Sequence, residues 1–149
     1  MKFKDIEHQK NYIQFINKAN IHDKDVERKS LFYLLAMFEE TRKHINSLYD
    51  FKENWIIPSS LNQAWQTSST RACTKLAFNL YNSFVGLTDE EASDYSIINV
   101  MAYAGSDLNK EVFLEAIKIR FDMAKGEDTF FDPEESIEEK LTKMGFKKS

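Results

Sequence analysis

The chain has 149 residues, of which 30% are charged, and a formal net charge of −4 at pH 7. The length fits one domain that can bury a core without a metal or a disulfide, and the charge argues against a basic nucleic-acid-binding protein. The single cysteine, Cys73, excludes an internal disulfide and is typical of a reducing compartment. We therefore expect a cytoplasmic protein, and no stretch of the chain approaches the roughly 20 apolar residues of a membrane span.

The composition favours helices. Four glycines and two prolines are few for a sandwich or barrel with many tight turns, whereas Leu, Ile, Ala, Lys and Glu suit helices. We predict an all-α fold, a single-domain bundle of about four long helices with several short ones. The first long helix is predicted to begin after a capping residue, Asp5, and to end near Asn20, with Ile6, Ile13 and Ile16 at helical spacing.

A second long helix is predicted over about residues 23–49. Residues 31–38 are apolar on all sides, which indicates a central buried helix. Beyond Glu39 the apolar residues narrow to one stripe, so the helix is expected to leave the core or bend there. The stripe consists of Leu34, Phe38, Thr41, Ile45 and Leu48.

A connector containing Pro58 leads to a third long helix. Its start is predicted at Thr67 or Ser68, and Gly86 is expected to end it. Its apolar face is formed by Cys73, Leu76, Ala77, Leu80 and Phe84.

The rest of the chain is predicted to add a short helix within YSIINVMAYAG and a fourth long helix from about Asp107. Residues 1–125 are expected to form the helical domain, and residues 126–149 a C-terminal helical extension, packed on the domain or semi-detached from it. Asp132 and Pro133 are predicted to start the helix of that extension. Its amphipathic stripe consists of Ile137, Leu141 and Met144.

The residues give little support to catalysis. Glu40 and His44 have the i, i+4 spacing of two metal ligands, but no HExxH or CxxC motif supplies further ligands. Cys73 lies on an apolar helix face, where cysteine is usually a core residue. We expect no cofactor and no metal, and an enzyme with His44 as general base ranks last among the functions considered.

A polar cluster is the one candidate binding site. The end of the second helix carries Arg42 and His44, and the two helices are expected to be antiparallel neighbours, so that this end approaches the start of the third. Residues 54–88 contain no Asp or Glu but include Arg71 and Lys75, and a helix N-terminus favours anions. The predicted site residues are Arg42, His44, Trp65, Gln66, Thr67, Ser68, Ser69, Thr70 and Arg71.

A purely structural interpretation of the same residues is simpler. In it Ser68 or Ser69 caps the helix, Arg71 pairs with a glutamate at position 39 or 40, and Trp65 covers the joint between the helices.

Three pieces of the chain, ETRKHINSLYDF, AWQTSST and LAFNLYN, resemble a family of short uncharacterised proteins, a domain of unknown function. They lie within residues 38–82, with weaker similarity through VFLEAIKIRF, and the segment after about Lys125 looks like an addition. The resemblance is to proteins of low-GC Gram-positive bacteria and their phages and mobile elements. It implies no activity, only the context of small accessory proteins that bind and regulate.

Two functions follow from these observations. The first is a non-enzymatic accessory protein that binds a protein partner, as a phage or mobile-element modulator of a host system. The second is a protein that binds a small anionic, nucleotide-like ligand through Arg42, His44, Trp65 and Arg71. Direct nucleic-acid binding is disfavoured because the chain lacks a basic recognition helix.

Overall fold

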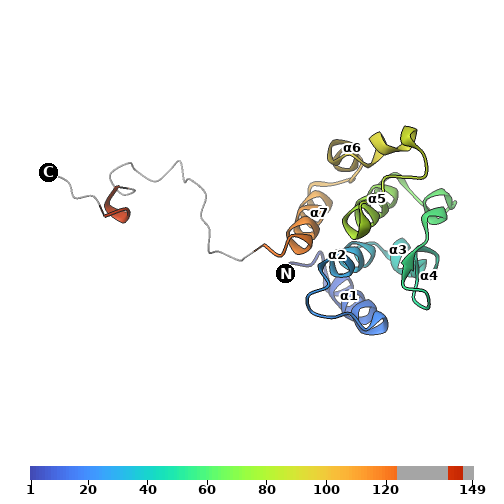
Figure 1. Cartoon of the computed structure of the whole chain (residues 1–149), viewed down its shortest axis with the longest axis horizontal. Coiled ribbons are helices and arrows are strands. Elements are labelled where there is room, and N and C mark those ends of the chain that lie inside the picture. The colour runs from blue at the N-terminus through green and yellow to red at the C-terminus, as the bar shows by residue number, and fades with distance from the viewer. Residues whose placement is uncertain (124–140, 146–149) are drawn as a thin grey trace.

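The computed structural model describes residues 1–123 and 141–145, and the elements below lie in the first of these ranges. Helices dominate, and the strands form a single two-stranded antiparallel hairpin (Figure 1). In chain order the elements are α1 (Ile6–Ala19), α2 (Val26–Leu35), α3 (Glu39–Lys43), α4 (Ile45–Leu48), β1 (Tyr49–Asp50), β2 (Trp55–Ile56), the 3-10 helix η1 (Pro58–Asn62), α5 (Ser68–Asn82), the 3-10 helix η2 (Asp89–Tyr95), α6 (Ile97–Ala102) and α7 (Asp107–Arg120).

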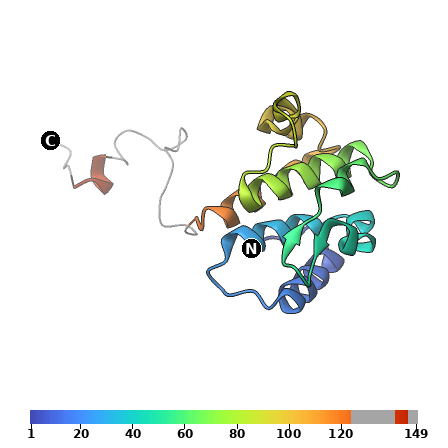
Figure 2. The same ribbon diagram turned by 45° about the vertical axis from the view of Figure 1, so that its right-hand side comes forward.

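Helix α2 occupies the centre of the molecule. It packs against α1, α5 and α7, while α6 lies on the far side of α5 (Figures 1 and 2). Every residue from Ser30 to Met37 is buried, which agrees with the apolar run in the sequence. A helix surrounded by others on all sides needs no polar face, and this explains the lack of amphipathic pattern in residues 31–38.

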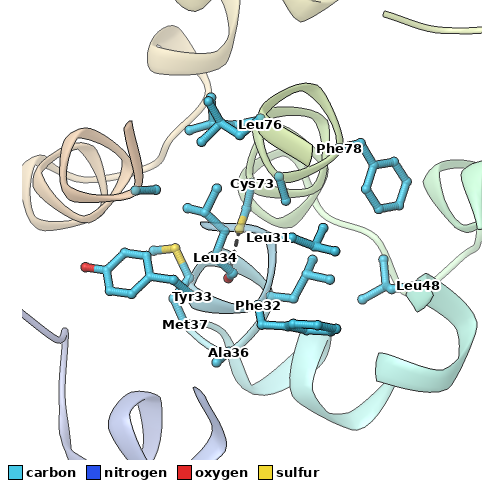
Figure 3. Packing of buried hydrophobic residues seen from close by; sticks show 14 of the residues in the cluster. Leu31, Phe32, Tyr33, Leu34, Ala36, Met37, Leu48, Cys73, Leu76 and Phe78 are labelled. Atoms are coloured by element: carbon cyan, nitrogen blue, oxygen red, sulfur yellow. Dashed lines mark hydrogen bonds between the residues drawn. The ribbon is translucent and has the colours of Figure 1, made fainter. Parts of the chain in front are cut away.

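Buried apolar side chains fill the space between α2 and α5. Leu31, Leu34 and Phe78 are fully buried, and Cys73 inserts its thiol beside them (Figure 3). The Cys73 Sγ donates a hydrogen bond to the Leu34 carbonyl oxygen at 3.2 Å. Cys73 is therefore a core residue, as its apolar neighbours predict.

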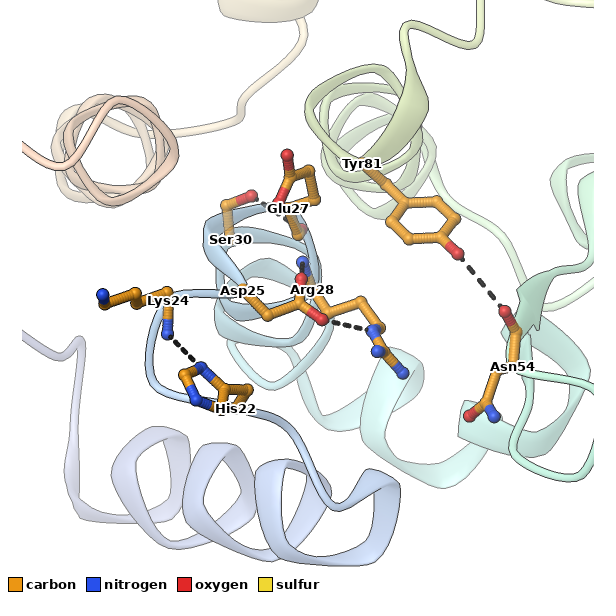
Figure 4. A network of polar contacts seen from close by, with 8 residues as sticks. All are labelled: His22, Lys24, Asp25, Glu27, Arg28, Ser30, Asn54 and Tyr81. Atoms are coloured by element: carbon orange, nitrogen blue, oxygen red, sulfur yellow. Dashed lines mark hydrogen bonds and ion pairs between the residues drawn. The ribbon is translucent and has the colours of Figure 1, made fainter.

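Capping side chains determine where the first two helices begin. Asp5 accepts a hydrogen bond from the backbone of His8 and starts α1 as predicted. Asp25 caps α2 by accepting from the Arg28 backbone at 3.0 Å, and its other oxygen accepts from Arg28 Nε at 2.6 Å (Figure 4). The second helix thus begins at Val26, three residues later than expected.

The prediction of one long helix over residues 23–49 is wrong. Helix α2 ends at Leu35, Phe38 has extended backbone angles (φ −110°, ψ 144°), and two short helices follow. Arg42 stabilises the break because its Nη1 donates to the Ala36 carbonyl oxygen at 3.0 Å, and that carbonyl has lost its place in a continuing helix. The sequence located the bend near Glu39 but not the interruption that produces it.

Of the three isoleucines at helical spacing in the first helix, only Ile16 packs against the core, where it is partly buried. Ile6 and Ile13 are 62% and 49% exposed, and the buried face carries His8, Tyr12 and Phe15 instead. These three residues are spaced i, i+4, i+7, so they form an equally good helical stripe. Their rings meet aromatic side chains of α2, which bury more area than the isoleucines would.

The later elements follow the predictions more closely. Helices α6 and α7 lie where the short and the fourth long helix are expected, and each begins after a serine cap. Helix α5 begins at Ser68, but Ser83, in the left-handed conformation (φ 66°), ends it rather than Gly86. The hairpin Tyr49–Asp50 with Trp55–Ile56 is an element that the all-α prediction lacks.

The predicted C-terminal helix falls mainly outside the described residues. Of its stripe, Leu141 and Met144 are described and are 42% and 70% exposed. In the part of the chain that is described, no helix has both the length and the apolar character needed to cross a bilayer.

Candidate functional site

The structure brings the two halves of the predicted polar cluster together at one contact. The rings of His44 and Trp65 are stacked, with centroids 4.4 Å apart and planes 5° from parallel. The Trp65 Nε1 donates to Gln63 Oε1 at 2.5 Å. Because Trp65 covers the junction between α4 and the start of α5, the structural interpretation accounts for this residue.

Two of the four hydroxyl side chains at the start of α5, Thr67 and Thr70, form hydrogen bonds within the chain. Thr67 caps the helix, since its Oγ1 accepts from the Thr70 backbone while Thr70 Oγ1 accepts from the Thr67 backbone. This reciprocal pair is a capping box. The cap is therefore Thr67 and not Ser68 or Ser69, so that detail of the structural interpretation is wrong.

Gln66 connects this cap to the interior. It is buried, and its Nε2 donates to the Ser60 carbonyl oxygen and to Thr74 Oγ1, each at 3.3 Å. Its Oε1 accepts from Thr70 Oγ1 at 2.7 Å. With all these polar atoms paired, Gln66, Thr67 and Thr70 have structural partners in place of an external ligand.

Ser69 lies where the turn between α6 and α7 comes close to the start of α5. Gly105, in the turn between α6 and α7, has φ +98°, and a Cβ added there would lie 2.5 Å from the Ser69 Oγ. Because Gly105 has no Cβ, the turn can lie against Ser69 at the start of α5.

Within residues 1–123 and 141–145, Arg71 forms no ion pair with a carboxylate. Its Nε donates to the Leu61 carbonyl oxygen at 3.1 Å, whereas Glu39 forms an ion pair with Lys43 at 2.9 Å. Among the described residues, no ion pair joins Arg71 to an acid at position 39 or 40. The bond to Leu61 fixes one edge of the guanidinium and leaves the two terminal nitrogens for another acceptor.

The outer face of α5 borders a hollow of about 320 Å³, the α5–α6 hollow. It is formed where α6 and η2 pack across α5, at the upper right of the ribbon in Figure 1. Its lining residues are Ser68, Arg71, Ala72 and Lys75 from α5, Asp94 from η2, Asn99 and Val100 from α6, and Tyr103 just after α6.

The lining of this hollow carries two cations, Arg71 and Lys75, and one acid, Asp94. Arg71 and Lys75 lie one turn apart, and the Lys75 ammonium lies 5.7 Å from the centroid of the Tyr95 ring. Asp94 is the single acid in the lining, and within residues 1–123 no ion pair connects it to either cation. The hollow thus combines two cations held by neutral groups with amide and hydroxyl donors, an arrangement suited to a carboxylate or phosphate.

Exposed apolar side chains of α6 and of the residue after it are close in sequence to residues that line the hollow, or line it themselves, and we call Ile97, Ile98 and Tyr103 the α6 ridge. Ile98 is 81% exposed, and Tyr103 and Ile97 are each about half exposed. Large apolar side chains that gather beside a polar hollow are typical of a contact surface.

The sequence identified part of this site. Ser68 and Arg71 belong to the predicted cluster, and Lys75 was marked by the acid-free window. Asp94, Asn99 and Tyr103 were missed, because only the packing of η2 and α6 on α5 brings them there. Arg42, His44 and Trp65 do not line the hollow.

Cys73 and His8, two further groups with possible reactivity, are buried. Burial raises the pKa of the Cys73 thiol and lowers the pKa of His8. Residues 1–123 and 141–145 contain no group of three or more His, Cys, Asp or Glu placed to hold a metal ion. The α5–α6 hollow and the α6 ridge therefore form the candidate site.

Residues 1–131 match the model of a family of unknown function, DUF6075. The chain belongs to this family, as the resemblance of its central segment indicates. No curated protein and no solved structure shows significant similarity to the chain.

Proposed function

We propose that this member of a family of unknown function is a non-enzymatic accessory protein that binds a protein partner through the α5–α6 hollow and the α6 ridge. The observation that carries the proposal is the pair Arg71 and Lys75, which line one hollow beside exposed apolar side chains and form no ion pair with any acid that the structure describes. We place the protein in the cytoplasm, as a modulator of a host system encoded by a phage or mobile element.

The site determines the chemistry of the partner. A guanidinium offers a fork of donors to a carboxylate, and an ammonium adds a second positive charge without fixed geometry. Ile97 and Ile98 offer exposed apolar area on the neighbouring helix α6. The partner is therefore an acidic segment with neighbouring apolar side chains, whose carboxylate enters the hollow.

The test is recovery of a partner from the native host. The tagged protein is compared with Arg71→Ala/Lys75→Ala and with a control, Lys10→Ala/Lys52→Ala, that removes two exposed charges elsewhere. A partner held by wild type and control but lost by the first variant supports the proposal. Equal recovery by all three proteins would contradict it.

A second candidate function is binding of a small anionic, nucleotide-like ligand in the same hollow. It is favoured by the anchored guanidinium of Arg71 and by the volume of about 320 Å³, at the lower end of the range for ligand pockets. The exposed ring of Tyr103 would face a base or another flat group. Arg42, His44 and Trp65, which the sequence assigned to this ligand, do not line the hollow.

Thermal unfolding in phosphate, citrate or a nucleoside monophosphate, against chloride of equal ionic strength, separates the two functions. Stabilisation that disappears in Arg71→Ala supports the small ligand. Asp94→Asn sharpens the test, because removal of the single acid should tighten binding of a plain anion several-fold. Absence of any anion-specific stabilisation would leave protein binding as the function of the hollow.

A further inference from the structure

The first four residues form a strap that contacts α1, α2 and α7. The Lys2 backbone N–H donates to Glu115 Oε2 of α7 at 2.7 Å, and the Lys2 carbonyl oxygen accepts from Tyr33 Oη of α2 at 2.6 Å. Within the strap, the Phe3 ring packs toward the core, with its centroid 5.2 Å from that of His8 and 5.8 Å from that of Tyr33. The strap is thus fastened to α1, α2 and α7 together.

His8 holds the inner end of this strap. Its ring is fully buried; the Nδ1 accepts the Lys4 backbone N–H at 2.9 Å, and the Nε2 lies 2.6 Å from the Tyr33 carbonyl oxygen. A carbonyl oxygen only accepts, so Nε2 carries the proton and Nδ1 has none. Only the neutral ring with the proton on Nε2 satisfies both neighbours.

Protonation cannot be accommodated without a change. A proton on Nδ1 would face the Lys4 N–H, leaving two donors in contact and no acceptor. Burial lowers the pKa of His8 from its ordinary 6.5, and the Tyr33 carbonyl and Asp5 oppose this shift. The charged and titratable groups facing the ring or its two partners are Lys4, Asp5, Tyr12, Tyr33, Arg42 and Glu115.

We propose that His8 is an acid-sensitive latch, whose protonation breaks the Lys4 bond and releases residues 1–4 from α2 and α7. The strap forms one wall of a second hollow, of about 340 Å³, lined among others by Phe3, Tyr33, Leu108 and Val112. Release removes the Phe3 wall and opens this face of α7. The latch lies apart from the α5–α6 hollow and does not depend on the function proposed for it.

The test is a nuclear magnetic resonance titration of the full chain. The ring signals of His8 report protonation, and the ¹H–¹⁵N heteronuclear NOE of Phe3 and Lys4 reports the order of the strap. We expect both to change with one midpoint below pH 6.5, while NOE values within α1 stay constant. A strap that keeps its NOE while His8 titrates would overturn the proposal, and so would a His8 that stays neutral until the whole chain unfolds.

Two variants separate the latch from other effects of acid. His8→Gln keeps an amide that can donate to the Tyr33 carbonyl but does not titrate, so the acid step of the strap should disappear. His22→Gln replaces an exposed histidine and should leave that step in place. If His8→Gln does not fold, the wild-type midpoints still decide the matter. Loss of the step in His22→Gln would contradict the assignment to His8.

Discussion

The two faces of α5 use their polar side chains differently. The inner face places Thr70, Cys73 and Thr74 against the core, where each polar atom has a partner in the chain. The outer face places Arg71 and Lys75 at a hollow, where the Leu61 carbonyl oxygen accepts from Arg71 and the Tyr95 ring lies near the Lys75 ammonium. Adjacent residues of one helix point in directions about 100° apart, so a continuous polar run can serve both the fold and a site.

The largest effect should come from the inner face. Phe78 is fully buried, and Phe78→Ala should reduce the free energy of unfolding by about 3–5 kcal/mol because it removes packing and leaves a cavity. Urea denaturation measures this, with Lys75→Ala as the control from the outer face, for which we expect about 0.5 kcal/mol or less. Comparable losses in both variants would remove the distinction between the faces.

Gln66 tests whether the polar part of the inner face is structural. Gln66→Ala leaves the Ser60 carbonyl and the Thr74 hydroxyl without this buried partner, at a cost of about 1–3 kcal/mol. Gln14→Ala, at an exposed position of α1, is the control and should be nearly neutral. A Gln66 variant as stable as wild type would return this residue to the candidate ligand site.

The free energy of unfolding should depend on pH through His8. The fold lowers the pKa of His8. Below pH 6.5 the unfolded chain therefore binds a proton at His8 more readily than the folded chain does. The free energy of unfolding should therefore fall with pH from 6.5 toward 5, by at most about 1.4 kcal/mol per pH unit for one proton.

His8→Gln should lose this slope and His22→Gln should keep it. Thermal melts at half-unit pH steps measure both variants. Equal slopes in wild type and His8→Gln would assign the pH dependence to other groups.

The cap of α5 should give the smallest effect. Thr67→Ala removes the side-chain acceptor of the capping box and should cost about 1 kcal/mol, whereas Ser68→Ala should cost almost nothing. Denaturation of the two variants distinguishes the observed cap from the serine cap that the sequence suggested. The reverse order would contradict the hydrogen bonds at the start of α5.

Hydrophobic periodicity was sufficient to predict several of the helices. The apolar run of α2, the start of α5 and the position of α7 were recoverable because a buried or amphipathic helix leaves a regular pattern. The face of α1 was not, because Ile6 and Ile13 form one plausible stripe and Tyr12 and Phe15 another, and only aromatic partners in α2 decide between them.

The site was predictable only in its local part. Ser68, Arg71 and Lys75 share one helix face, so spacing alone groups them. Asn99 and Tyr103 join them because α6 packs across α5, a tertiary contact with no local signal in the sequence. The break before α3 was hidden for a similar reason, since the Arg42 bond to the Ala36 carbonyl forms only in the folded chain.

The most direct test of the central claim is chemical-shift mapping of the ¹⁵N-labelled full chain. Inorganic phosphate and a short glutamate-rich peptide serve as the two probes, with chloride as the ionic-strength control. We expect saturable shifts at Ser68, Arg71, Lys75 and Asn99 with at least one probe, and none at Gln66 or Thr74. Shifts centred on His44 and Trp65, or no saturable shift with either probe, would contradict the assignment of the outer face of α5 as the binding site.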